Sequence, residues 1–143
     1  MKKFFVLIAL VLGTQMMMAQ TQKTFVKSFN LEGNNFVVVK LDGAVEVKEW
    51  NEPIVRVHTN VELENGSSSV LKQFLMLGRY NLSSRLNNGD YVIESAQRVP
   101  NVKYKGQVLV EKVTYTVFAP SNVEVTIEGD ETTSTVGGID PSL

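Results

Sequence analysis

The stretch Phe36-Val-Val-Val-Lys-Leu-Asp-Gly-Ala-Val-Glu-Val-Lys-Glu-Trp50 decides the fold class of this chain. Its apolar residues recur at a spacing of two, which is typical of a β-strand with one face in the core and the other in water. The pattern returns in Val55-Arg-Val-His-Thr-Asn-Val-Glu-Leu63, after the turn Asn51-Glu52-Pro53. Similar alternation, interrupted by turn residues, continues to Ile127, and in the segment from Gln107 to Ala119 it predicts that Val113, Tyr115 and Val117 form the inner face. The sequence therefore predicts an all-β domain.

The turn at Asp42-Gly43 divides the first stretch into two arms. A two-residue hairpin loop would pair Val39 with Glu46 and so mix the core and solvent faces, which excludes that register. A three-residue loop would pair Leu41 with Val45 and keep the faces apart. A solenoid corner, at which the chain bends without pairing the two arms, satisfies the pattern as well. Both alternatives stay open.

One short helix is predicted at about Ser69 to Leu77. Ser67-Ser68-Ser69 supplies candidate N-caps, and Gly78 provides the stop. Because a helix of about ten residues is marginal alone, we expect it to close the open end of the β core; a membrane- or partner-binding helix is the alternative. Its apolar stripe consists of Val70, Leu71, Phe74, Leu75 and Leu77.

The first 19 residues have the pattern of a cleavable export signal. Lys2 and Lys3 precede an apolar run from Phe4 to Gly13, and Ala19 is a small residue at which a signal peptidase could cut. The apolar run is too short for a spanning helix, so we expect no membrane insertion after cleavage. The expected organisation is a signal peptide at 1–19, a single all-β domain at 20–128 and a flexible C-terminal tail at 129–143.

Charge and cysteine content restrict the partners and the location. Removal of Lys2 and Lys3 takes the basic residues from 14 to 12 against 15 acidic residues, a net charge of about −3. That balance argues against binding to nucleic acid or to anionic membrane surfaces. The chain contains 0 cysteines, so we expect no disulfide, no thiolate metal site and no lipid anchor. An exported protein is predicted, located in the periplasm, on the cell surface or in the medium.

The residue types in the chain do not suggest catalysis. His58 is the single histidine and lies on the polar side of its strand, where we expect it to be solvated. Ser67 to Ser69 lack the context of a nucleophile elbow. Glu46, Glu49, Glu62 and Glu64 are expected to be solubilising charges rather than the paired carboxylates of a glycoside hydrolase. We predict no enzymatic activity, no catalytic residue and no cofactor.

Two further groups of residues could bind a ligand. The acidic group Glu128, Asp130 and Glu131 lacks the spacing of a calcium loop, so no metal is expected there. Trp50, beside the turn Asn51-Glu52-Pro53, is the aromatic best placed for exposure and the single candidate for partner binding, although a lone tryptophan at a strand end more often caps the core. The other aromatics considered for a sugar-stacking platform are Tyr80, Tyr91, Tyr104 and Tyr115.

Three parts of the chain carry a family resemblance: Phe36–Trp50 with Ile54-Val-Arg-Val57, Asn88-Gly-Asp-Tyr-Val-Ile93, and Tyr115-Thr-Val-Phe-Ala-Pro120 with Val123-Glu-Val125. They resemble the head GIN domain family of autotransporter adhesins and related adhesin-like families of exported Bacteroidota proteins. The resemblance implies a single-stranded right-handed β-solenoid, an adhesin-like or undefined surface role, and no catalytic residues.

These observations predict a short right-handed β-solenoid or a β-sandwich with one short helix. The predicted function is that of an exported, non-enzymatic, adhesin-like binding module, with an unknown protein or glycan partner and with Trp50 in the contact. The alternative from another class is a carrier of a small apolar ligand, built as a β-barrel or sandwich with the helix as its lid. A carrier needs a cavity of a few hundred Å³, so its interior would distinguish the two.

Overall fold

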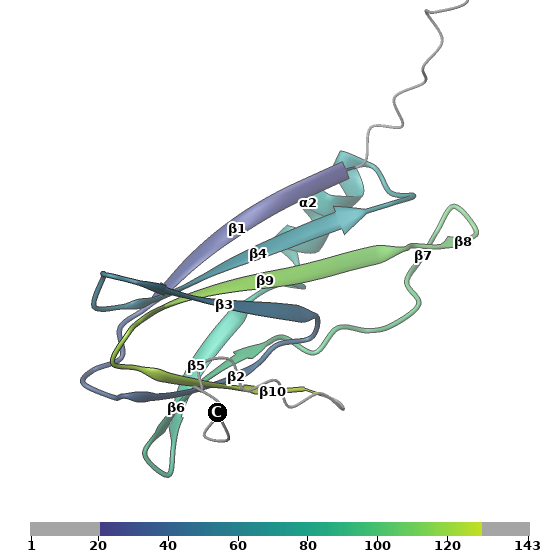
Figure 1. Cartoon of the computed structure of the whole chain (residues 1–143). Coiled ribbons are helices and arrows are strands. Elements are labelled where there is room, and N and C mark those ends of the chain that lie inside the picture. The colour runs from purple at the N-terminus through teal and green to yellow at the C-terminus, as the bar shows by residue number, and fades with distance from the viewer. Residues whose placement is uncertain (1–20, 130–143) are drawn as a thin grey trace, which may run out of the picture.

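A computed structural model describes residues 21–129 of the chain (Figure 1). Within these residues the chain forms β-strands and one short helix, so the all-β prediction is confirmed. The predicted signal peptide at 1–19 and the predicted tail beyond Gly129 lie outside the described residues.

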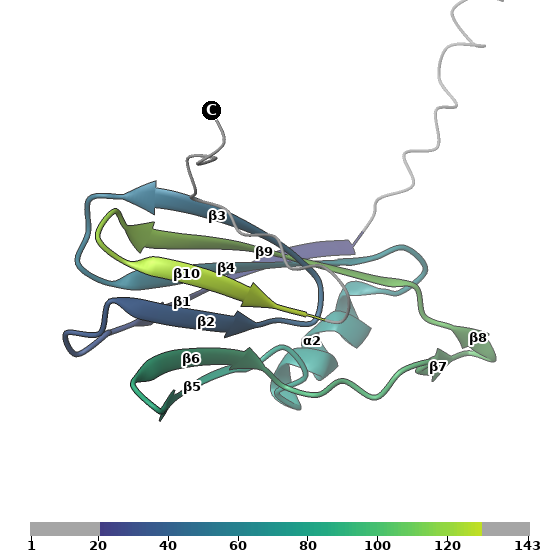
Figure 2. The ribbon, with the colours of Figure 1, turned by 60° about the horizontal axis from the view of Figure 1, so that its bottom comes forward.

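Eight strands form two four-stranded sheets that lie one over the other (Figure 2). Sheet A has the order β1 (Thr21–Phe29), β4 (Val55–Leu63), β9 (Glu111–Pro120), β3 (Ala44–Trp50). Sheet B has the order β10 (Glu124–Glu128), β2 (Phe36–Lys40), β6 (Asp90–Ser95), β5 (Leu82–Asn87). A small hairpin of β7 (Lys103–Tyr104) and β8 (Gln107–Val108) extends from one end of the molecule (Figure 1).

The turn at Asp42-Gly43 is a corner between the two sheets. Strand β2 pairs with β10 and β6 in sheet B, whereas β3 pairs with β9 in sheet A. The two arms are therefore unpaired, and the three-residue hairpin is wrong. Gly43 is required because the corner packs on β9: a Cβ there would collide with the carbonyl oxygen of Val113 and would lie 3.1 Å from the ring of Tyr115.

The core lies between the sheets and is filled by the inward-facing side chains of both. Alternate residues of β4 are buried, as the sequence alternation predicts. The predicted inner face of β9 is also confirmed, because Val113, Tyr115 and Val117 are buried. The aliphatic side chains with essentially no exposed surface are Val39, Val55, Val57, Val61, Leu63, Ile93 and Val117.

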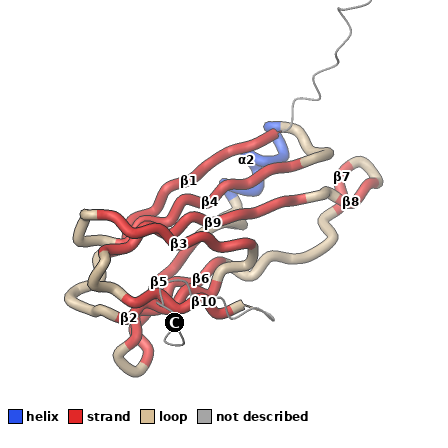
Figure 3. Tube along the Cα trace, viewed as in Figure 1, coloured by secondary structure: helices blue, strands red, loops and turns tan. Residues whose placement is uncertain are grey.

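The helix α2 (Ser68–Met76) lies at one end of the sheets, close to the predicted position (Figure 3). The Ser67 hydroxyl accepts a hydrogen bond from the backbone N–H of Val70 at 3.3 Å, which makes Ser67 the N-cap. Val70 and Leu71 are buried, so this part of the stripe packs on the core as expected. Leu77 departs from the prediction because the helix has ended there and its side chain is 82% exposed.

Among residues 21–129, no helix is both long enough and apolar enough to cross a membrane.

Candidate functional site

A group of aromatic and cationic side chains lies on the outer face of sheet A, away from sheet B. Strand alternation places it there, because Val117 in β9 and Val57 in β4 point into the core and their neighbours point outward. Each member is partly exposed. We call Trp50, Arg56, His58 and Phe118 the outer cluster.

Phe118 lies at the centre of the outer cluster. Its ring centroid is 4.9 Å from that of His58 and 5.6 Å from that of Trp50. The register of sheet A pairs Phe118 with Arg56 on one side and with Lys48 on the other. One aromatic ring is thus flanked across the strands by two cationic side chains, since directly opposite residues have Cβ atoms about 5 Å apart.

Trp50 is held in place at the end of β3. Its indole Nε1–H donates a hydrogen bond to the carbonyl oxygen of Ile54 at 2.9 Å, across the turn that follows the strand. The guanidinium carbon of Arg56 lies 4.9 Å from the centre of the Trp50 ring, in cation–π geometry. Trp50 packs on Arg56 and Phe118 and not on the hydrophobic core, which argues against the core-capping alternative.

Trp50 and His58 are both partly exposed, and His58 lies on the outward parity of β4 that the sequence indicates, but the sequence interpretation overlooked Phe118. A usable signal was present, because the inner positions Tyr115 and Val117 leave Phe118 on the outward parity of the same strand. The other tyrosines do not join Trp50: Tyr104 packs against the core, and three are buried, namely Tyr80, Tyr91 and Tyr115.

The remaining candidates are dispersed. Ser67 is engaged as the helix cap, and Glu128 forms an ion pair with Lys40 at 2.9 Å. Asp130 and Glu131 lie outside the described residues. Within the described part of the chain, no three His, Cys, Asp or Glu side chains are placed to hold a metal ion.

A second polar group, which the sequence did not suggest, lies where α2, the connection after β6, and β9 meet. Glu111 at the start of β9 binds Arg79 through two contacts, Nε–Oε2 at 3.0 Å and Nη2–Oε1 at 3.1 Å. Arg98 Nη1 lies 3.2 Å from the same carboxylate, and the Tyr80 hydroxyl also donates to it. We call Arg79, Tyr80, Arg98 and Glu111 the buried network.

The pKa shifts in the buried network follow from these contacts. Burial alone would raise the pKa of Glu111, but hydrogen bonds from Arg79 and Tyr80 and the nearby arginine charges outweigh it, so the pKa is lowered. Burial, with the hydrogen bond to Glu111, raises the pKa of Tyr80 well above its usual range. At neutral pH the carboxylate is charged and the phenol is neutral. The network also reaches the corner, because Arg98 Nη2 lies 3.0 Å from Asp42 Oδ2.

Two hollows open on the described surface. One, of about 220 Å³, is lined in part by Phe25, Leu75 and Leu82, where Lys27 Nζ donates to the Leu82 carbonyl at 2.6 Å and joins β1 to β5. The other, of about 210 Å³, is lined in part by Arg79, Arg98 and Glu111 of the buried network. Both are smaller than the roughly 300–1,000 Å³ of typical small-molecule sites.

Neither a protein-family model nor a curated protein sequence matches this chain. Two solved structures are similar to it: a "putative cell adhesion protein" from Clostridium sporogenes (10% identity, TM-score 0.41) and a "putative adhesin" from Bacteroides fragilis (8% identity, TM-score 0.39). The matches cover 76% and 75% of this chain, and 47% and 40% of the respective structures. The chain therefore spans less than half of either protein, and both likenesses are remote.

Proposed function

We propose that this chain is an exported, adhesin-like binding module that contacts a protein or glycan partner through the outer cluster. The observation that carries the proposal is the position of Trp50 and Phe118, whose rings lie on the outer face of sheet A without packing on the core. Aromatic and arginine side chains concentrate binding energy at interfaces. The β core has its own inward-facing residues and does not need these rings for its packing.

We further propose that the module is not an enzyme. The described groups with clear pKa shifts include Glu111, Tyr80 and Arg79, which bind one another and so are engaged inside the fold. A catalytic acid or base must instead exchange a proton with a substrate. This arrangement favours a structural role for the ionisable residues that the fold perturbs.

A second candidate function is carriage of a small apolar molecule, which the 220 Å³ hollow between β1 and β5 favours. Phe25, Leu75 and Leu82 form the apolar part of its lining, which also includes Lys27, Thr59 and Asn81. Its size argues for a ligand smaller than most carried molecules. Saturable uptake of an apolar fluorescent probe, abolished by Leu82→Trp but not by Trp50→Ala, would favour the carrier over the surface module.

For the fold we favour a short solenoid. Strands β2 and β10 are parallel neighbours in sheet B, and β3 and β9 are parallel neighbours in sheet A. The chain crosses from sheet B to sheet A between β2 and β3, and from sheet A back to sheet B between β9 and β10, as the chain of a solenoid does at its corners. The antiparallel pairs β1–β4 and β5–β6 cover the opposite side. Membership of the head GIN domain family stays a prediction.

The binding proposal is tested with panels of immobilised cell-surface glycans and matrix proteins. We expect the wild-type protein to bind a member of the panel, and Trp50→Ala to reduce that binding about tenfold or more. Phe36→Ala is the matched control, because Phe36 is also an exposed aromatic (55%) but lies on sheet B. Equal losses in the two variants, or a loss that follows the unfolded fraction in urea denaturation, would contradict the proposal.

The proposed export is tested on the protein recovered outside the cytoplasm. N-terminal sequencing should begin near Gln20, and mass spectrometry should detect no lipid. An exported protein that retains Met1 would show that the signal assignment is wrong.

A further inference from the structure

We propose that the ligand of the outer cluster is an acidic glycan, in which a uronic-acid ring stacks on Phe118 and its carboxylate binds Arg56 and Lys48. This inference rests on the proposed function and names the chemical class of the partner.

Arg56 is oriented but not neutralised. Its Nε–H donates to the Ser28 hydroxyl at 3.1 Å, and its guanidinium stacks on Trp50. Within residues 21–129, its two Nη groups have no hydrogen-bond or ion-pair partner. A fixed guanidinium with two free NH₂ groups matches a planar carboxylate in bidentate geometry.

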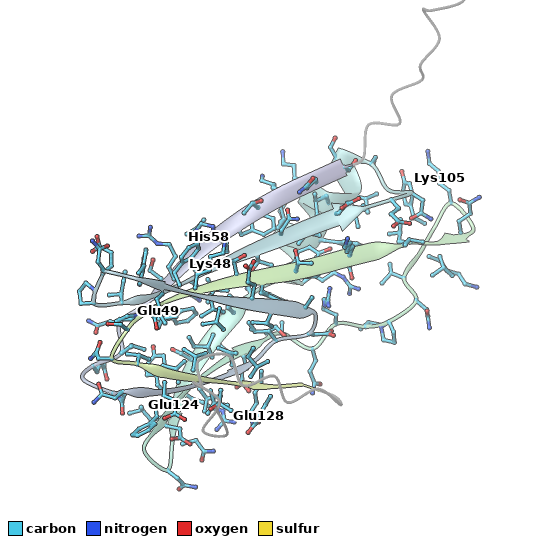
Figure 4. All side chains as sticks on the ribbon, in the orientation of Figure 1. Lys48, Glu49, His58, Lys105, Glu124 and Glu128 are labelled. Atoms are coloured by element: carbon cyan, nitrogen blue, oxygen red, sulfur yellow. The ribbon has the colours of Figure 1, made fainter. Side chains whose placement is uncertain are left out.

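Lys48 supplies a second positive charge on the other side of Phe118. Its Nζ lies 3.9 Å from Glu46 Oε1, and both side chains are more than half exposed. Such a pair is weak, so Lys48 remains able to turn toward an anion. Figure 4 labels Lys48, which lies on β3, and His58, which lies on β4. This local positive charge contrasts with the acidic balance of the whole domain.

Short polar side chains continue from the outer cluster along sheet A, with the exposed carboxylate of Glu46 opposite Thr116 on the neighbouring strand β3. Thr116 and Thr114 follow Phe118 on the outward face of β9, and Asn60 pairs with Thr114 on β4. On the edge strand, the Thr24 hydroxyl donates to Asn60 Oδ1 at 3.2 Å. Hydroxyl and amide groups spread over a sheet face suit the many hydroxyl groups of a saccharide chain, while the aromatic ring suits the apolar face of one sugar.

A glycan fits this surface better than an acidic peptide does. Peptides commonly bind by adding a strand to a sheet edge, by laying a helix in a groove, or by docking as an extended segment in an aromatic groove. The outer cluster lies mainly on β4 and β9, the two central strands of sheet A, whose backbone groups are already paired on both sides. Recognition there must rely on side chains.

The test uses polygalacturonate and the same polymer after carboxyl reduction, which removes the charge and keeps the sugar ring. We expect the protein to bind the acidic form at least tenfold more tightly, with affinity falling as salt increases. Arg56→Gln should weaken binding to polygalacturonate about tenfold. Lys112→Gln is the matched control: Lys112 is exposed on the outward face of β9, six residues and about 20 Å from Phe118, and should change affinity less than twofold.

Each outcome decides the proposal. Equal binding of the reduced polymer, or tighter binding of poly-glutamate than of polygalacturonate, would overturn the acidic-glycan assignment. If Arg56→Gln does not fold, Arg56→Lys serves instead, because it keeps the charge and loses the fork, and unchanged affinity in that variant would overturn the bidentate contact. Trp50-dependent binding of a neutral glycan or protein, without polygalacturonate binding, would refute this inference and leave the proposed function standing. If polygalacturonate binds equally well to the wild-type protein, Trp50→Ala and Arg56→Gln, both the acidic-glycan inference and the proposed function are refuted.

Discussion

Two regions of this molecule bring arginine and aromatic side chains together, and they differ in how the arginine is satisfied. In the buried network, Arg79 stacks on Phe74 at 5.0 Å and is paired with Glu111. In the outer cluster, Arg56 stacks on Trp50 at a similar distance of 4.9 Å, but no carboxylate among residues 21–129 pairs with it. The first region is electrostatically complete within the fold. In the second region, the positive charge of Arg56 is left available to an external ligand.

The positions of the two regions explain the difference. The buried network joins segments far apart in sequence, because Glu111 lies 32 residues from Arg79 and 13 from Arg98. Arg98 also binds Asp42 at the corner between the sheets. The network therefore fixes the end of α2 and the long connection after β6 against β9. The outer cluster joins strands that are already hydrogen-bonded to one another, so its side chains are not needed to hold the fold.

Loss of the carboxylate at Glu111 should have the largest effect on stability. Glu111→Gln leaves Arg79 and Arg98 without their main counter-charge, at positions where all three side chains are 12–13% exposed, and should cost about 3 kcal/mol in the free energy of unfolding. Urea denaturation measures this. Glu94→Gln, in an exposed pair with Arg85, is the control and should stay within about 0.5 kcal/mol. If the two variants cost the same, the network is not structural.

Truncation of the apolar stripe of α2 should cause the next largest loss in the free energy of unfolding. Phe74 is half-buried and packs on the core and Tyr80, so Phe74→Ala should cost roughly 2–3 kcal/mol, below the 3–5 kcal/mol of a fully buried aromatic. Met76→Ala, on the same helix with a side chain that is 79% exposed, should be nearly neutral. Unchanged stability in Phe74→Ala, together with loss of partner binding, would make α2 a functional surface.

The buried network also predicts a pH dependence. Because the folded pKa of Glu111 lies below its unfolded value, its stabilisation is fully present above the unfolded pKa and is lost as the pH falls through the folded pKa. The free energy of unfolding, measured from pH 7 down to pH 3, should decline in the wild-type protein. Glu111→Gln should decline less over the same range. Identical slopes would mean that Glu111 does not titrate as the network requires.

Changes in the outer cluster should have the smallest effects on stability. Trp50→Ala should cost about 1 kcal/mol or less, since the ring is partly exposed and lies outside the core, and His58→Ala should stay within about 0.5 kcal/mol. Thermal or urea unfolding of both variants provides the measurement. A cost of several kcal/mol for Trp50→Ala would place the outer cluster with the buried network, as a stabilising element.

Much of the fold follows from local sequence. Two-residue alternation predicted the inner faces of β4 and β9, and the serine caps with Gly78 predicted α2 to within one residue at each end. The corner at Asp42-Gly43 could not be chosen over a hairpin, because both keep the same residues inward. The choice depends on Val113 of β9, which packs against Gly43 from 70 residues further along the chain.

The candidate site was predictable only in part. The outward position of His58 follows from strand parity, whereas the turn beside Trp50 made it a candidate without deciding between exposure and capping of the core. Their meeting with Phe118 requires β9 to lie between β3 and β4, an order that local patterns do not specify. The buried network could not be predicted for the same reason. In the sequence Arg79, Arg98 and Glu111 have the pattern of ordinary solvated charges, and only the tertiary fold brings them together.

The most direct measurement uses Trp50 itself, because it is the single tryptophan of the chain and its fluorescence therefore reports on the outer cluster alone. The unmodified protein is titrated with whichever member of the glycan and matrix-protein panel it binds, while tryptophan emission and binding are followed in parallel. We predict a change in Trp50 emission that saturates with the same Kd as binding, together with protection of the indole from acrylamide quenching. Saturated binding with unchanged emission and unchanged quenching would show that the partner contacts another face of the domain.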